Sequence, residues 1–152
     1  MRALPVRPED GPSVFREILQ DLPSFWGERD MAAQHQAVWL RQFAADAVIV
    51  RHDGVLAGYL LGVVTTRELA YVQLIATRTD QRGRGLGRLL YDSFLSQARR
   101  RGARRVEAIT STTNTGSVAF HQRLGFSADV VADYAGPGQS RVLFSLALSD
   151  GH

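Results

Sequence analysis

The sequence has 152 residues, of which 45% are hydrophobic, and it carries a formal net charge of +3 at pH 7. This length and composition predict a single globular domain over residues 1–152 with a sizeable core. Because the chain contains no cysteine, a disulfide framework and thiolate catalysis are both excluded.

Nothing in the sequence predicts a targeting or membrane segment. Residues 1–6 lack an apolar signal core, and the apolar run 55–64 is broken by glycines and is shorter than the roughly 18 residues of a membrane span. We therefore expect a soluble, cytoplasmic protein that does not contact a membrane.

The chain opens with a short predicted strand over residues 2–6, followed by an amphipathic helix. The apolar face of this helix is formed by Val14, Phe15, Ile18 and Leu19. Pro23 lies just beyond its predicted end.

A loop that mixes Phe25 and Trp26 with charged residues comes next. A second helix is predicted from about residue 31 to residue 43. His35 and Trp39 are four residues apart on it, so we expect them to share a helix face and to pack.

Three strands follow in sequence. Residues 47–50 and 55–64 are β-branched runs joined through Asp53-Gly54, which is a strong short-range signal for an antiparallel hairpin. A third strand, residues 70–77, leads directly into a glycine-rich loop.

The loop Arg82-Gly83-Arg84-Gly85-Leu86-Gly87-Arg88 lies between this strand and a strongly amphipathic helix. Its glycines permit a tight turn with backbone N–H groups facing inward, and the following helix adds the positive end of its dipole. The helix carries apolar residues at three- and four-residue spacing up to Ala98, and Gly102 stands where a C-terminal cap belongs. The arrangement predicts a site for pyrophosphate.

The remaining elements are a strand over residues 105–111, a short helix over 114–123, and a closing hairpin of 126–134 with 141–148. The predicted order is β-α-α-β-β-β-α-β-α-β-β. It indicates an α/β (α+β) fold with a mixed, mostly antiparallel sheet.

All 18 basic residues are arginine, and nine of them lie between Arg78 and Arg105, where the only acids are Asp80 and Asp92. The arginines do not alternate with aromatic residues as a single-strand stacking platform requires, and no helix-turn-helix or zinc spacing accompanies them. We therefore expect no nucleic-acid partner and favour a phosphorylated cofactor.

Two other nucleotide motifs fit the loop poorly. A P-loop requires a lysine, which the chain lacks, and a dinucleotide fingerprint opens a βαβ unit early in a domain. The pattern Arg-x-x-Gly-x-Gly at residues 82–87 instead resembles the acyl-CoA loop of the GNAT N-acetyltransferase superfamily. Residues 114–126, in which an asparagine opens a short helix that ends in Leu-Gly-Phe, resemble the second signature of that superfamily. The resemblance covers nearly the whole chain.

The resemblance implies the GNAT fold, whose sheet opens beside the loop strand, with acetyl-CoA as the cofactor and no metal. The residues that it assigns to cofactor binding are Ile75, Ala76, Thr77, Arg82, Gly83, Arg84, Gly85, Leu86, Gly87, Arg88, Asn114 and Ser117. Backbone groups of 75–77 are expected to pair with the pantetheine arm and to polarise the thioester carbonyl. Asn114 is expected to bond the arm with its carboxamide, and the alternative is a simple helix N-cap.

The resemblance also points to the acceptor side. In GNAT proteins the region after the first helix forms a wall of the acceptor site, so Phe25 and Trp26 are candidate substrate contacts, with core packing as the alternative. The hairpin near Pro137 is the other expected wall.

The proton donor to the departing thiolate is predicted at His121. Many GNAT enzymes have a tyrosine seven residues after the motif asparagine, and this chain has His121 there. A histidine can donate a proton near neutral pH. The alternative is that His121 is a polar helix residue without a catalytic role. Tyr134 or Tyr71 would then be the donor.

No carboxylate matches either family pattern for the general base, because Ile109 and Tyr71 occupy the expected positions. Glu107 lies on the same strand face as Ile109 and is the first candidate, with Glu28 and Asp133 as further ones. Removal of the proton through ordered water, or binding of an already neutral amine, remains open.

The sequence thus predicts an acetyl-CoA-dependent N-acetyltransferase that acts on a primary amine by direct attack on the thioester. The acceptor, a small molecule or a peptide amine, and the use of longer acyl groups are undetermined. So is the oligomeric state, with a homodimer left open. A rival interpretation is a non-catalytic GNAT-like module that binds or senses acyl-CoA.

Overall fold

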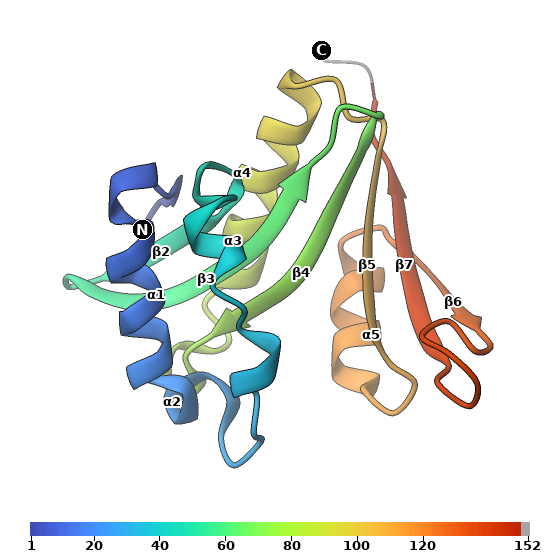
Figure 1. The fold of residues 1–152 in the computed structure, drawn as a ribbon, viewed down its shortest axis with the longest axis horizontal. Coiled ribbons are helices and arrows are strands. Elements are labelled where there is room, and N and C mark those ends of the chain that lie inside the picture. The colour runs from blue at the N-terminus through green and yellow to red at the C-terminus, as the bar shows by residue number, and fades with distance from the viewer. Residues whose placement is uncertain (150–152) are drawn as a thin grey trace. The chain divides into compact units, whose positions relative to one another are not determined.

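The computed structural model describes residues 1–149 (Figure 1). Its contacts divide the chain into two compact units. The first unit comprises Met1–Val63 and Leu74–Gln97, and the second comprises Val64–Gln73 and the described residues from Ala98 onward. A single domain over residues 1–152 remains a prediction.

The first unit contains the N-terminal strands and most of the helices (Figure 1). Its strands are β1 (Ala3–Pro5), β2 (Val48–His52), β3 (Val55–Val64, except for its last residue) and the end of β4 (Leu69–Thr77). The pairs β1–β2 and β2–β3 are antiparallel. Asp53 and Gly54 both have positive φ, 51° and 79°, as expected of a tight two-residue hairpin turn, so the hairpin prediction is confirmed.

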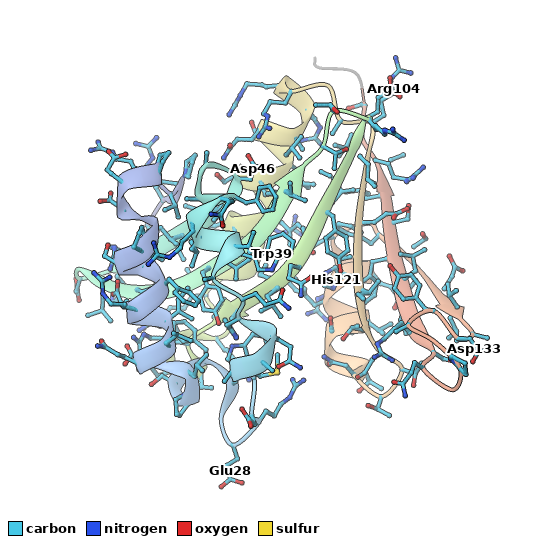
Figure 2. All side chains as sticks on the ribbon, in the orientation of Figure 1. Glu28, Trp39, Asp46, Arg104, His121 and Asp133 are labelled. Carbon is cyan, nitrogen blue, oxygen red and sulfur yellow. The ribbon has the colours of Figure 1, made fainter. Side chains whose placement is uncertain are left out.

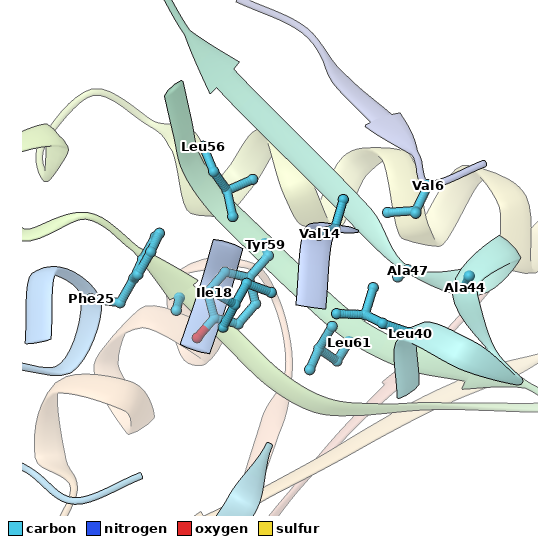
Figure 3. Close-up of a cluster of buried hydrophobic side chains, with 11 residues drawn as sticks. Val6, Val14, Ile18, Phe25, Leu40, Ala44, Ala47, Leu56, Tyr59 and Leu61 are labelled. Atoms are coloured by element: carbon cyan, nitrogen blue, oxygen red, sulfur yellow. The ribbon is translucent and has the colours of Figure 1, made fainter. Parts of the chain in front are cut away.

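The helices of the first unit are α1 (Gly11–Gln20), α2 (Leu22–Trp26), α3 (Val38–Arg41) and most of α4 (Leu86–Arg100). Val14 and Ile18 of α1 are buried, as their spacing predicts, and pack in a core with Phe25, Leu40 and Tyr59 (Figure 3). Leu19, which was expected on the same face, is exposed.

The prediction of one continuous helix over residues 31–43 is wrong. The structure has a 3-10 helix over Ala32–Gln34, a break at His35, and then α3. His35 turns its side chain inward, where Nδ1 bonds the carbonyl oxygen of Met31 and Nε2 bonds the hydroxyl of Tyr59. These bonds outweigh helix propensity. As a result, His35 and Trp39 do not share a helix face.

The second unit is built on β5 (Arg105–Ser111), β6 (Ser127–Val131), β7 (Arg141–Ala147) and the start of β4, with α5 (Thr115–Arg123). In this unit β4 pairs with β5 in parallel, and β7 pairs antiparallel with both β5 and β6. The order of neighbouring hydrogen-bonded strands is β1-β2-β3-β4-β5-β7-β6. The mixed α/β sheet is confirmed, and the strands follow in the predicted order. The helices differ from the prediction in two places: α2 lies in the segment predicted as a loop, and the predicted second helix is divided.

Among residues 1–149, no helix is long and apolar enough to span a bilayer.

Candidate functional site

The glycine loop lies in the first unit, between β4 and α4, as predicted. Gly83 and Gly85 have φ values of 83° and 74°, which L-residues with side chains rarely adopt. Within the described part of the chain, no heavy atom lies within 4 Å of the position that a Cβ would take at either glycine. The loop therefore leaves room for a ligand against its backbone.

Helix α4 provides the second element of an anion site. It begins at Leu86, which is buried and anchors the first turn, and the Leu89 N–H donates to the Gly85 carbonyl at 3.1 Å. The N–H groups that precede Leu89 in the helix have no acceptor within it, so they are available to an anion. Arg82, Arg84 and Arg88 are exposed around this turn. These residues fit the pyrophosphate that the sequence predicts.

The start of the loop is anchored to α2 by Arg78, which the sequence analysis did not single out. Its guanidinium forms an ion pair with Asp21, donates to the Leu56 carbonyl, and lies 5.0 Å from the centre of the Phe25 ring. Arg82 also reaches α2, with Nη2 3.4 Å from the Phe25 carbonyl oxygen. The nine clustered arginines are therefore not equivalent, because Arg78 holds the fold together.

Strand β4 runs beyond its pairing with β5. The parallel ladder joins Leu69–Val72 to Arg105–Ala108. Ile75, Ala76 and Thr77 lie past the last of these pairs, in the part of β4 that belongs to the first unit. Backbone groups in this position suit the strand-like pairing with a ligand that was predicted for them.

The second motif lies in the second unit, at the start of α5. Asn114 is the N-cap of this helix: its Oδ1 accepts the Ser117 N–H at 3.1 Å. Its Nδ2 donates to Thr110 Oγ1, also at 3.1 Å. The alternative interpretation of Asn114 as a cap is thus observed. A carboxamide nitrogen carries two hydrogens, so one N–H is left for the predicted cofactor bond.

His121 is a core residue of the second unit. Its side chain is 4% exposed, its ring stacks on Phe144, and the rings of Phe120 and Phe126 meet it edge-on. Nδ1 lies 2.8 Å from the Ser117 carbonyl oxygen and so carries the hydrogen. Burial lowers the pKa of the imidazole, although the bond to Ser117 opposes this shift. These contacts match the alternative of a packed helix residue, and the proton-donor role remains a prediction.

Glu107, Tyr71 and Tyr134 are brought together in the second unit. Glu107 is the register partner of Tyr71 and forms a 2.9 Å ion pair with Arg105. Burial, followed by the nearby Tyr134 and Glu107, raises the pKa of the Tyr71 phenol. Tyr134 itself is 44% exposed. The cluster combines a carboxylate with two phenols, groups that can bind an amine and move its proton.

The other two candidate bases have different surroundings. Glu28 is exposed and lies at the outer end of the loop after α2 (Figure 2). Asp133 accepts the Gly138 N–H at 2.8 Å and so closes the turn between β6 and β7. Asp133 therefore has a structural task, whereas Glu28 lies in the first unit on the connection of residues 27–31.

Phe25 and Trp26 differ in their surroundings. Phe25 is 1% exposed and packs edge-on against Tyr59, so it shows the core packing that was its alternative role. Trp26 is half-buried, and its Nε1 donates to the Tyr59 hydroxyl at 2.8 Å. Sequence reasoning missed Tyr59, which lies within an apolar run. The available signal was its hydroxyl, because a buried tyrosine OH normally requires a hydrogen-bond partner.

Comparison with known proteins identifies relatives in sequence and in fold. The family model of the acetyltransferase (GNAT) family matches residues 12–126. An uncharacterised N-acetyltransferase of Methanocaldococcus jannaschii is 38% identical over 63 residues, which is 41% of this chain and only 28% of that protein. An L-methionine sulfoximine/L-methionine sulfone acetyltransferase of Pseudomonas aeruginosa is 26% identical over 129 residues, 75% of this chain and 71% of the relative.

The fold has close structural relatives. One is the Salmonella typhimurium protein yncA, which was solved with its cofactor acetyl-CoA. Its TM-score is 0.72 at 18% identity, and the match covers 100% of this chain and 96% of the yncA chain. The family match spans well over half of the sequence and includes both predicted motifs. The chain therefore belongs to the acetyltransferase (GNAT) family of N-acetyltransferases, which use acetyl-CoA.

Proposed function

We propose that this protein acetylates a primary amine by direct attack of the amine on the thioester of acetyl-CoA. The observation that carries the proposal is the open glycine loop at the N-terminus of α4. The chain has no cysteine, so an acetyl-cysteine intermediate is not available to it.

Acetyl-CoA supplies the activated acetyl group when it is bound. The chain's contribution is to hold the cofactor still: the loop and the first turn of α4 bind the pyrophosphate, and the exposed arginines add positive charge. Ile75, Ala76 and Thr77 offer backbone groups beyond the β4–β5 ladder. We assign the polarisation of the thioester carbonyl to the N–H near Thr77.

Glu107 is the proposed base of the second unit. It is half-buried, and its neighbours are a cationic guanidinium and the Tyr71 phenol. A carboxylate in this setting attracts an ammonium group and can accept its proton, directly or through a water molecule. Trp26 is the proposed apolar contact of the acceptor in the first unit.

His121 and Tyr134 are the proposed donors to the departing thiolate. His121 lies one turn after Ser117 on α5, and Ser117 is itself a predicted cofactor contact. Tyr134 lies near Tyr71 and is accessible to solvent. The Tyr134 hydroxyl carries a proton that the developing thiolate can accept, whereas the His121 ring has to be protonated first, which its lowered pKa opposes.

The proposed acceptor class is a small amine or a peptide amino terminus. The Pseudomonas aeruginosa relative is named for two amino-acid derivatives. Its name supports a small amino compound as the first class to test here. A soluble cytoplasmic location and a homodimer remain predictions.

The test is release of free thiol from acetyl-CoA across a panel of amines. The panel contains L-methionine sulfone, putrescine, tyramine, kanamycin and a peptide that begins with alanine. We expect amine-dependent thiol release with at least one of them and a loss of at least tenfold in Glu107→Gln. The matched control is Glu9→Gln, at an exposed position in the first unit. Tight binding of acetyl-CoA without any amine-dependent release would favour the non-catalytic, acyl-CoA-sensing alternative.

A further inference from the structure

A chain of hydrogen bonds closes the segment between α2 and α3. Trp26 is the last residue of α2, and His35 follows the 3-10 helix Ala32–Gln34. Both side chains converge on the hydroxyl of Tyr59, a fully buried residue of β3. The segment 26–35 is therefore held at both ends, because Trp26 and His35 bond the same hydroxyl oxygen. All three residues lie in the first unit.

The direction of each bond follows from chemistry. The Met31 carbonyl oxygen can only accept, so His35 Nδ1, 2.7 Å away, carries the hydrogen. In the neutral imidazole Nε2 is then an acceptor, and it receives the Tyr59 O–H at 2.7 Å. The Tyr59 oxygen in turn accepts the Trp26 Nε1–H at 2.8 Å.

The three side chains also support one another by packing. The Trp26 and His35 rings meet edge-on at 6.0 Å, and the His35 and Tyr59 rings do so at 5.8 Å. His35 is buried, and burial lowers its pKa, which is consistent with a neutral ring. Removal of one member leaves a buried donor or acceptor without its partner, which is the costly way to lose a hydrogen bond.

Trp26 is held in its place by this chain while part of its surface stays accessible. Its ring is half-buried, and the Arg29 guanidinium lies 5.6 Å from its centre. After Trp26 the backbone turns sharply at Gly27, whose φ is 64°. The Tyr59 hydroxyl therefore fixes the position of Trp26, and the exposed residues Glu28, Arg29 and Asp30 follow directly after it.

We propose that Tyr59 and His35 are positioning residues for the amine acceptor: they hold the Trp26 indole in the orientation in which it meets the acceptor. The inference rests on the proposed function of Trp26 as an acceptor contact. It adds a buried pair that touches neither substrate and acts through Trp26. The effect belongs to acceptor binding and not to binding of acetyl-CoA.

The kinetic test uses Tyr59→Phe, which removes the hydroxyl and keeps the ring against Phe25. With the panel amine that the wild type acetylates fastest, the KM for the amine should rise about three- to tenfold, the effect of one or two lost hydrogen bonds. The KM for acetyl-CoA should stay within about twofold. His35→Leu should behave like Tyr59→Phe, whereas His35→Gln, whose amide oxygen can accept the Tyr59 O–H, should recover most of the wild-type value.

The matched control is Trp39→Phe. Among the described residues, Trp39 Nε1 is a buried indole nitrogen with no hydrogen-bond partner, so Trp39→Phe changes an aromatic side chain of the same unit without removing a hydrogen bond. The KM values of Trp39→Phe should equal those of the wild type. Equal amine KM values in Tyr59→Phe and Trp39→Phe, with both variants folded, would overturn the positioning role.

A second measurement does not need turnover. The chain has two tryptophans, so Trp39→Phe leaves Trp26 as the sole indole fluorophore and Trp26→Phe leaves Trp39. Adding Tyr59→Phe should raise acrylamide quenching of Trp26 about twofold and leave that of Trp39 unchanged. Unchanged quenching of Trp26 would refute the proposal that the Tyr59 hydroxyl holds the indole in place. Failure of every panel amine would count against the proposed function, while the quenching result would still decide whether Tyr59 positions Trp26.

Discussion

The imidazole of His121 lies flat on the ring of Phe144, with the ring centres 4.0 Å apart and the planes 3° apart. This stack joins α5 to β7 within the second unit. A neutral imidazole suits such a site, because protonation would place a charge among the aromatic rings of Phe120, Phe126 and Phe144. The stack therefore ties the stability of the protein to pH.

Stability should fall as the pH drops below about 6.5, the ordinary pKa of histidine. Burial lowers the pKa of both His121 and His35 in the folded protein, so the unfolded chain binds protons first. The contribution of the two neutral histidines to the free energy of unfolding is complete above that pH and is lost as the pH falls through their folded-state pKa values. Urea unfolding between pH 5 and pH 8 measures this dependence. His121→Phe, which keeps an aromatic ring on Phe144, should flatten it, and an unchanged slope in that variant would contradict the assignment.

The two candidate proton donors should differ in their kinetic effect. Tyr134 is 44% exposed and His121 is 4% exposed, and a donor has to reach the departing thiolate. We expect Tyr134→Phe to lower kcat by about tenfold or more and His121→Phe to lower it less. Steady-state rates from pH 6 to pH 9 provide the comparison. A tenfold loss in His121→Phe that is rescued by His121→Tyr would instead establish His121 as the donor.

Two glycines in helices should respond oppositely to alanine. A Cβ on Gly11 of α1 would lie 1.9 Å from the Leu40 carbonyl oxygen, so Gly11→Ala should destabilise the fold by about 1–3 kcal/mol. Gly116 of α5 has an ordinary φ, and the nearest atom to its Cβ position is 3.9 Å away. Gly116→Ala should therefore stabilise the fold by about 0.5–1 kcal/mol. Denaturant unfolding of both variants measures the two changes in the free energy of unfolding. Changes of the same sign would contradict the packing of α1 against α3.

Gly85→Val should abolish measurable binding of acetyl-CoA, because the side chain would occupy the space next to the loop backbone. Positive φ makes any such substitution strained, so a control with equal strain is needed. Gly102, at the C-terminal end of α4, has a φ of 89° and equally open surroundings among the described residues. Gly102→Val should keep wild-type affinity in calorimetry. Loss of affinity in both variants would point to strain and not to the cofactor site.

Asn114 offers a way to separate capping from cofactor binding. Asn114→Ala removes the cap and should destabilise the protein by about 1 kcal/mol, whereas Asn114→Ser keeps a good N-cap. Both variants lack the carboxamide N–H. If that group bonds the pantetheine arm, both should weaken acetyl-CoA affinity by about 0.5–2 kcal/mol. Wild-type affinity in Asn114→Ser would restrict the residue to capping.

The features that the sequence predicts correctly are local ones. The Asp53-Gly54 turn and the positive-φ glycines before α4 each depend on the backbone preferences of a few neighbouring residues, as does the cap at Asn114, which was the alternative to its expected cofactor role. The two family motifs are also contiguous stretches, so the family and its cofactor were predictable without coordinates. The order of the strands, α1, α4 and α5 followed from apolar periodicity and turn signals.

The tertiary structure decided the roles of residues whose partners are distant in sequence. His35 breaks the predicted helix because Tyr59, 24 residues later, donates its O–H to the His35 ring nitrogen Nε2. The burial of His121 follows from Phe144, 23 residues later, which stacks on its ring, and its role as a proton donor stays a prediction. Arg78 reaches Asp21 across 57 residues. A sequence pattern records which residues can bury or bond, but the choice of partner is made by the free energy of the whole packed core, in which no buried polar group is left unpaired without cost.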